Sequence, residues 1–320
     1  MIEGSLKDRI LILDGAMGTM LRSGGPHGQE DSTDVLCLTA PQAVVSIHRR
    51  YLEAGADIIE TNTCCANRLS LQSYSCSHPA AEINRAGAAI ARSEADRQTA
   101  LTPDRPRYVA GAVGPAAPAL LSRLSLMAQR SLHAELHTAY VEQMTALAEG
   151  GVDILLIETS FDLTDTLAAL RAAREAADRA DREIGIMVAA TLAEHTGRMP
   201  SGHDVTELIE AATFARPLAI GLNCSSGPVS LLPALRRLAA ASPYPIIAYP
   251  NAGLPGPDGN YPCTPRLFAG EMLEMADEGL LNIAGGCCGT TPEHIAMLAA
   301  GMQSRIRRPV FSHKSKAHII

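Results

Sequence analysis

The sequence is poor in aromatic residues. Its 320 residues include no tryptophan and only four phenylalanines, and aromatic residues together make up 3% of the chain. Aromatic faces are common protein partners of quaternary ammonium and other cationic ligands. The chain therefore has limited means of enclosing a cationic ligand in an aromatic cage, although Phe161, Tyr249 and the other tyrosines keep a small one feasible.

Signals of export, of membrane insertion and of nucleic-acid binding are also missing. The first residues show no basic segment followed by an apolar one, and no run of roughly 18 apolar residues follows. A net charge of −7 and a pI near 5.8 disfavour nucleic acid and anionic membranes as partners. We therefore expect a cytoplasmic protein whose eight cysteines are free thiols or metal ligands rather than a disulfide framework.

Short apolar runs alternate with alanine-rich segments of helical character. Their near-continuous apolarity is typical of parallel strands that are buried on both faces. The expected strands are 10–13, 57–60, 108–112, 152–157, 185–190, 219–222, 246–248 and 281–284. The expected helices are 41–54, 80–97, 134–149, 165–180, 205–215, 228–241, 265–278 and 292–303. We expect the last helix to begin with Thr291 as N-cap, or with a capping box from Thr290 to Glu293.

Eight alternations of strand and helix predict a single (β/α)8 TIM barrel. The prediction is one domain over residues 1–320, with its core at about 8–303 and a short tail at 304–320 that is a surface segment or the remnant of a link. An open, doubly wound sheet is the alternative. In a barrel the carboxyl ends of all strands meet at one face, where the active sites of this fold lie.

Three cysteines follow two of the expected strands. Cys224 follows the sixth, and Cys287 and Cys288 lie in a Gly-Gly-Cys-Cys-Gly segment after the eighth. Adjacent strand residues point to opposite faces, so the glycines would let the backbone turn both sulfurs toward one ion. Three protein ligands with an open fourth position are typical of catalytic zinc. Free cysteines are often small buried hydrophobes, but a vicinal pair among glycines fills a core poorly.

The remaining cysteines and the single histidines are weaker candidates. Cys64–Cys65 is a second vicinal pair after a strand, without flanking glycines, and we expect it to be structural. Structural, surface or capping roles are expected for Cys37, Cys76, Cys263, His195, His203 and His294.

Two carboxylates, Asp14 and Glu158, also stand at strand ends. Loop solvation or helix capping would explain either one. The functional interpretation is that they hold a ligand's ammonium group, while backbone N–H groups of the glycine-rich turn after Asp14 receive a carboxylate. A ligand with both charges is an amino acid. Asn251 lies in Pro-Asn-Ala-Gly, which is also good turn chemistry.

Five segments, 13–20, 55–63, 221–224, 250–255 and 285–295, carry a family resemblance. They resemble the homocysteine S-methyltransferase family, and most of all the homocysteine-binding barrel of cobalamin-dependent methionine synthase. The resemblance covers about residues 8–303, and its Gly-Gly-Cys-Cys-Gly-Thr-Thr-Pro-Glu-His stretch is highly specific. One difference is Cys64–Cys65, where relatives commonly carry an aromatic and then a polar residue.

The resemblance implies a zinc enzyme that methylates homocysteine to methionine. Cys224, Cys287 and Cys288 would be the zinc thiolates, and Asn251 a possible fourth ligand when homocysteine is absent. Asp14 and Glu158 would hold the homocysteine amino group. Further substrate contacts are expected at Ala16, Met17, Gly18 and Thr19, around its carboxylate, and at Asn62.

The methyl donor is the open part of this interpretation. Zinc keeps a coordinated thiol deprotonated, so methyl transfer to the sulfur requires no general base. The resemblance favours methylcobalamin carried by a separate corrinoid protein, and S-methylmethionine or S-adenosylmethionine is the alternative. Selenohomocysteine is an alternative acceptor. An alternative of another class is a non-catalytic zinc-thiol binding subunit of a larger methyltransferase complex.

Overall fold

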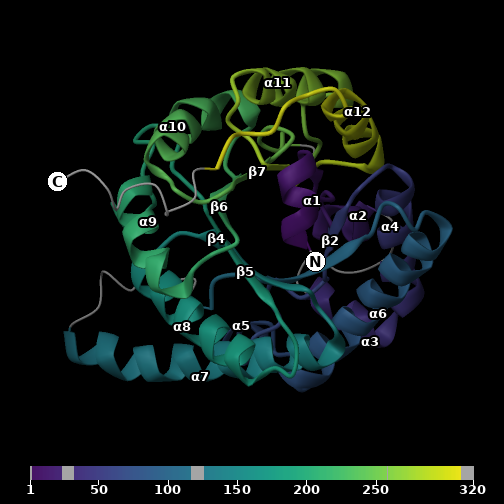
Figure 1. Ribbon diagram of the computed structural model, residues 1–320. Helices are drawn as coiled ribbons and strands as arrows, with labels where there is room; N and C mark the ends of the chain where they lie inside the picture. Colours follow the sequence, from purple (N-terminus) through teal and green to yellow (C-terminus); the bar gives the residue numbers. More distant parts are fainter. Residues whose placement is uncertain (1, 24–31, 117–125, 258, 311–320) are drawn as a thin grey trace.

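The computed structural model describes residues 2–23, 32–116, 126–257 and 259–310 (Figure 1). Eight parallel strands lie in the order β1-β8-β7-β6-β5-β4-β3-β2. Backbone contacts between the two outer strands of this order complete the ring: Leu13 bridges Ile58, and the Asp14 N–H donates to the Ile58 carbonyl at 3.0 Å. The barrel is therefore closed, which confirms the (β/α)8 prediction and excludes the open sheet.

All eight expected strands are present, some with shifted ends. Their bounds are β1 (Leu11–Ile12), β2 (Ile58–Glu60), β3 (Tyr108–Val113), β4 (Ile154–Ser160), β5 (Gly185–Ala190), β6 (Ala219–Cys224), β7 (Ile246–Pro250) and β8 (Ile283–Ala284). β4 continues past its expected end because its pairing with β5 shifts register between Ile157 and Ser160, and Thr159 there has a left-handed φ of 56°. Such a bulge re-aims the side chains around it.

The eight expected helices are also present and surround the strands in Figure 1. They are α4 (Pro41–Glu53), α6 (Ala80–Leu101), α7 (Leu126–Gly150), α8 (Leu163–Arg179), α9 (Val205–Ala212), α10 (Pro228–Ala241), α11 (Pro265–Asp277) and α12 (Pro292–Met302). The short helices α1 (Ile2–Asp8), α2 (Gly18–Ser23), α3 (Leu36–Thr39) and α5 (Arg68–Ser73), with the 3-10 turn η1 (Thr33–Val35), were not expected, and the end of the expected helix 205–215 is the 3-10 turn η3 (Thr213–Ala215). Residues 205–215 divide into α9 and η3, and α7 begins before the expected residue 134.

Alternate strand residues fill the inside of the barrel, and the others pack under the helices. The inner cluster includes Leu11, Leu13, Ile58, Ala110, Ile154, Leu156, Met187, Ala189, Ala219, Ile247, Tyr249 and Ile283. Ile2 and Leu6 of α1 join this inner cluster, and Figure 1 shows α1 lying over the ring of strands. α1 therefore covers the N-terminal end of the barrel, and the opposite end carries the loops that were expected to form the site.

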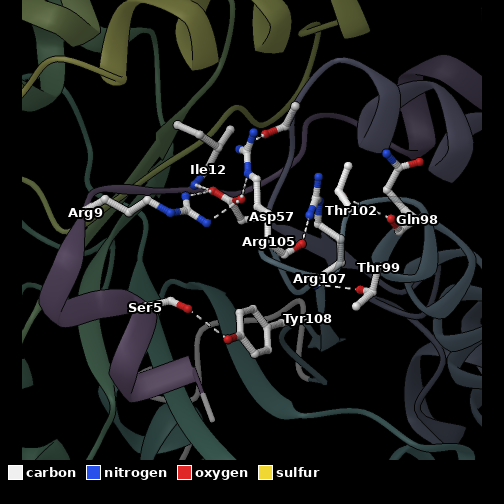
Figure 2. Close-up of polar contacts among 11 residues, drawn as sticks. Ser5, Arg9, Ile12, Asp57, Gln98, Thr99, Thr102, Arg105, Arg107 and Tyr108 are labelled. Atoms are coloured by element: carbon white, nitrogen blue, oxygen red, sulfur yellow. Dashed lines mark hydrogen bonds and ion pairs between the residues drawn. The ribbon is translucent and has the colours of Figure 1, made fainter.

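An ion-pair network ties this N-terminal end together (Figure 2). The buried carboxylate of Asp57 accepts hydrogen bonds from Arg9 at 2.8 Å, from Arg105 at 2.7 Å and from the Ile12 N–H at 2.9 Å. Burial alone would raise the pKa of Asp57, but the two arginines hold it below its usual value. A cavity of about 690 Å³ opens at the same end and contains none of the predicted site residues.

The start of α12 separates the two capping alternatives. Thr291 is the N-cap, and its N–H donates to Nδ1 of His294 at 3.1 Å. The capping box from Thr290 to Glu293 is wrong, because the Thr290 hydroxyl donates to the Cys287 carbonyl at 2.8 Å instead. The expected capping role of His294 is confirmed.

Two further expectations concern membrane-spanning helices and the C-terminal tail. None of the described helices has the length and apolar character needed to cross a membrane. The first part of the expected tail lies on the barrel surface, because the Arg308 guanidinium donates to the carbonyls of Ala239, Ser242 and Tyr244. Residues 311–320 of the tail lie outside the described residues.

His48 on α4 generates a prediction about acid stability. It is fully buried, and neither ring nitrogen has a hydrogen-bond partner among the described residues. Burial lowers the pKa of His48 to about 4, and the charge of nearby Glu94 only partly opposes this shift. A lowered folded-state pKa means that the stability is present above the unfolded pKa, near 6.5, and is lost as the pH falls toward 4. Between pH 6.5 and 4.5 we expect the free energy of unfolding to fall by roughly 2 kcal/mol less in His48→Leu than in the parent protein. Urea unfolding of both proteins at the two pH values measures this, and equal losses in both would contradict it.

Candidate active site

The fold brings the three predicted cysteines together at the C-terminal end of the barrel. Their Sγ atoms all lie within 4.8 Å of one another, and those of Cys224 and Cys287 are 2.9 Å apart. Among the residues that the structure describes, Cys224, Cys287 and Cys288 form the one such group of potential metal ligands. Cys64 and Cys65 do not belong to it.

The end of β7 holds the loop that follows β8. The Pro250 carbonyl accepts the Cys287 N–H at 2.8 Å, and the Ala252 N–H donates to the Cys288 carbonyl at 2.9 Å. These two bonds continue the sheet pairing beyond the last paired residues of β8, so they fix the height and the direction of the vicinal cysteines over the barrel.

The segment at the end of β7, residues 250–252, also bonds to the end of β6. The Asn251 N–H donates to the Cys224 carbonyl at 3.1 Å, and the Asn251 amide donates to the Ser225 carbonyl. Cys224 and Ser225 both have left-handed backbones, with φ of 55° and 61°, a conformation that is uncommon outside glycine. The chain therefore leaves strand geometry at Cys224 without a glycine at that residue, which the sequence pattern did not predict.

The oxygen of Asn251 is available as a ligand. Its Oδ1 atom is buried and has no hydrogen-bond partner among the described residues, because the amide nitrogen makes the contact to Ser225. Three thiols and one carbonyl-type oxygen form a donor set that suits zinc.

The three thiols differ in how readily each one ionises. Hydrogen bonds from Cys224 and Cys287 lower the pKa of Cys288, whereas the hydrogen bonds that Cys287 makes to its two neighbours raise its own pKa. Protein groups alone therefore favour one thiolate held by two thiols. A bound cation would allow all three sulfurs to ionise.

Three carboxylates lie at the carboxyl ends of β1, β2 and β4, of which β1 and β2 are neighbours. Asp14 follows β1, Glu60 ends β2 and Glu158 lies in the bulge of β4. The Glu60 N–H donates to Oδ2 of Asp14 at 3.1 Å, while Oδ1 of Asp14 and Oε1 of Glu60 are buried and unpartnered. None of the three forms an ion pair with any side chain in the described ranges. Solvation and helix capping do not explain these groups.

Burial, rather than their mutual repulsion, is the main cause that raises the pKa of each carboxyl group. The charge of Glu158 adds to the increase at Asp14 and Glu60, and the pKa of Glu158 rises to about 7. A ligand's ammonium group would lower all three values. Glu60 was not among the predicted site residues, although its place at the end of β2 matches that of Asp14 after β1.

The glycine-rich turn 15–19 packs against the Cys-Cys loop. The Ala16 N–H donates to the Thr290 hydroxyl at 3.1 Å, and the Thr19 hydroxyl accepts the Gly289 N–H at 3.3 Å. The backbone N–H of Ala16 is therefore engaged within the protein. The N–H groups of Met17, Gly18 and Thr19 are the remaining candidates for a ligand carboxylate among the predicted residues.

The Asn62 side chain is bonded to a neighbouring turn of the protein. Its side-chain amide donates to the Thr33 carbonyl at 2.7 Å and lies near Sγ of Cys37 at 3.7 Å. This contact attaches η1 to the end of β2. Asn62 thus supports the loop beside the site.

Two tyrosines stand close to the thiols. Tyr249 points into the barrel and is fully buried, and its hydroxyl has no hydrogen-bond partner in the part of the chain that the structure describes. The ring of Tyr261 lies against Gly289, where an added Cβ would be 2.1 Å from its Cγ atom. Neither was predicted to be a site residue, because a tyrosine outside a motif gives no signal in a single sequence.

The geometry agrees with a comparison against known families. The homocysteine S-methyltransferase family matches residues 11–302. The chain belongs to this family. It is accordingly an enzyme of the homocysteine S-methyltransferase class, and the family resemblance seen in the sequence is confirmed.

Solved structures support the fold of this methyltransferase. The metallated homocysteine methyltransferase MmuM from Escherichia coli superposes with a TM-score of 0.74 and 23% identity, covering 92% of this chain and 96% of that one. Its apo form gives a TM-score of 0.68 and 23% identity, covering 92% and 97%. DHDPS from Cyanidioschyzon merolae, with lysine bound, gives 0.51 and 13%, covering 91% and 73%. These likenesses show a shared barrel.

The contact between Gly289 and Tyr261 generates a prediction about the Cys-Cys loop. Gly289 has φ of 80° and no room for a Cβ, whereas Gly259 has φ of 78° and open space around it. Gly289→Ala should lower the free energy of unfolding by roughly 2–4 kcal/mol, and the matched Gly259→Ala by about 1 kcal/mol. Urea unfolding measures both. Equal losses would mean that the tyrosine contact does not constrain the loop.

Proposed function

We propose that this methyltransferase transfers a methyl group to the thiol of homocysteine, giving methionine, at a zinc ion bound by Cys224, Cys287 and Cys288. The observation that carries the proposal is the meeting of three thiols beside buried, unpaired carboxylates. We further propose that residues 8–303 act as one homocysteine-binding unit.

The three thiols would hold zinc, and the Asn251 oxygen would complete the set while homocysteine is absent. When bound, zinc supplies the Lewis acidity that keeps a substrate thiol ionised at neutral pH. The contacts of Pro250–Ala252 hold the sulfurs in place, so little rearrangement is needed on binding. Transfer to a sulfur that is already ionised requires no general base.

The carboxylates account for an amino-acid substrate. Asp14, Glu60 and Glu158 would receive its ammonium group through their free oxygens. The N–H groups of Met17, Gly18 and Thr19 would receive its carboxylate. Recognition of both charged groups at one end of the substrate would leave its thiol extended toward the three cysteines.

For the donor, we propose methylcobalamin carried by a separate corrinoid protein. The scarcity of aromatic residues and the sequence resemblance to the homocysteine-binding barrel of methionine synthase support this choice. S-methylmethionine or S-adenosylmethionine is the second candidate, favoured by the position of Tyr261 beside the thiols. A non-catalytic zinc-thiol subunit is disfavoured because the whole set of ligand and substrate groups is present.

Removing one zinc thiol should abolish metal binding. We expect Cys224→Ala and Cys287→Ala to lower the zinc content at least tenfold from about one per chain, with loss of methyl transfer, because two thiols bind zinc far more weakly than three. Cys76→Ala, outside the thiol cluster, is the control and should retain both properties. Elemental analysis after dialysis gives the zinc content. Full activity of Cys287→Ala would refute the site.

The donor is decided by parallel turnover assays on the zinc-loaded protein with homocysteine. We expect transfer from methylcobalamin and little or none from S-methylmethionine or S-adenosylmethionine. Saturable turnover on S-methylmethionine without any corrinoid would overturn the corrinoid proposal and establish the second candidate. Turnover with any soluble donor would also discard the non-catalytic alternative.

A further inference from the structure

Tyr51 on α4 reaches the glycine-rich turn that follows β1. The residue is fully buried, and its hydroxyl lies 2.8 Å from the Ala16 carbonyl and 3.1 Å from the Thr290 carbonyl, to both of which it donates. A hydroxyl has one proton to give, so this proton is shared between the turn and the Cys-Cys loop. Burial is the main cause that raises the pKa of Tyr51 well above its usual value, and the hydroxyl therefore keeps the proton that it donates.

The close approach of Tyr51 depends on a glycine. A Cβ on Gly15 would lie 2.9 Å from both Cε1 and the hydroxyl oxygen of Tyr51, and 2.6 Å from Oγ1 of Thr290. A side chain at residue 15 would push the phenol away from the turn. Glycine lets ring and backbone touch, and this contact fixes the hydroxyl opposite the Ala16 carbonyl.

The bond to the Ala16 carbonyl orients a whole peptide group. This carbonyl and the Met17 N–H belong to one planar trans peptide, which directs them to opposite sides. Tyr51 on one side therefore turns the Met17 N–H to the other. The Met17 N–H has no hydrogen-bond partner among the residues that the structure describes. A hydrogen bond to the carbonyl also polarises the peptide, which makes the N–H a better donor.

We propose that Tyr51 is a positioning residue, which orients the Ala16–Met17 peptide so that the Met17 N–H receives the substrate carboxylate. This inference rests on the proposed binding of homocysteine. Both partners of the Tyr51 hydroxyl are backbone carbonyls, so Tyr51 acts on the substrate through the peptide group. Because one of these carbonyls belongs to the Cys-Cys loop, the same hydroxyl relates the place of the substrate carboxylate to that of its thiol.

Other bonds join the turn to the Cys-Cys loop without involving this peptide group. The Gly286 N–H donates to the Asp14 carbonyl at 3.0 Å, and the Gly289 N–H donates to the Thr19 hydroxyl at 3.3 Å. These bonds would keep the turn and the loop together after the Tyr51 hydroxyl is removed. The loss should therefore fall on the direction of one peptide group and leave the rest of the site in place.

The test compares two ligands that differ only in the carboxylate. Homocysteine and 3-aminopropanethiol share the thiol and the amino group, and calorimetric titration of the zinc-loaded protein gives a Kd for each. Tyr51→Phe keeps the ring that packs on Gly15 and removes only the hydroxyl. It should weaken homocysteine about tenfold and leave 3-aminopropanethiol within about twofold, because only homocysteine presents a carboxylate to the Met17 N–H. The zinc content should equal that of the parent protein.

Tyr108→Phe is the matched control. It also removes a hydrogen-bonded hydroxyl, which lies 3.0 Å from Oγ of Ser5 at the opposite end of the barrel (Figure 2). It should leave the ratio of the two Kd values unchanged. An unchanged ratio in Tyr51→Phe, loss of zinc from that variant, or the same selective loss in Tyr108→Phe would overturn the inference. Failure of the parent protein to bind homocysteine would overturn the proposed function, and with it this inference, and is recognised before any variant is measured.

Discussion

The geometry of the thiol cluster depends on the end of β7, a strand that contributes none of the three sulfurs. Pro250, Asn251 and Ala252 bond to the backbone of Cys287, Cys224 and Cys288, respectively. Because β7 lies between β6 and β8, these bonds turn two segments far apart in the chain into one rigid arrangement. Parallel strands alone would bring the segments to the same end of the barrel, but they would not set the distance between the sulfurs.

Much of this could be predicted from the sequence. Apolar runs and alanine-rich helices gave the barrel because the burial of both strand faces leaves a clear pattern. The zinc cysteines were recognisable because a vicinal pair among glycines is rare as core filling. The ends of β4 and β6 were not predictable, since a left-handed Thr159 or Cys224 depends on tertiary contacts rather than on residue type.

The positions of Glu60 and Cys64 in the folded barrel could also not be predicted from the sequence. Glu60 becomes a site residue only when the barrel closes and β2 comes beside Asp14. Cys64 packs against the end of β3 only because a glycine, Gly114, stands there. Both depend on a neighbouring strand, and a single sequence does not mark which strands become neighbours.

The two ends of the barrel differ in electrical character. Arg9, Arg105 and Asp57 meet at the end covered by α1, with Arg107 nearby, whereas Asp14, Glu60, Glu158 and the thiols gather at the other. Once ionised, the carboxyl groups would give the mouth of the site a negative field. A zwitterion that approaches this mouth would then be favoured with its positive end inward. The field would speed the arrival of cationic and zwitterionic molecules and slow that of anions, and salt would weaken this sorting.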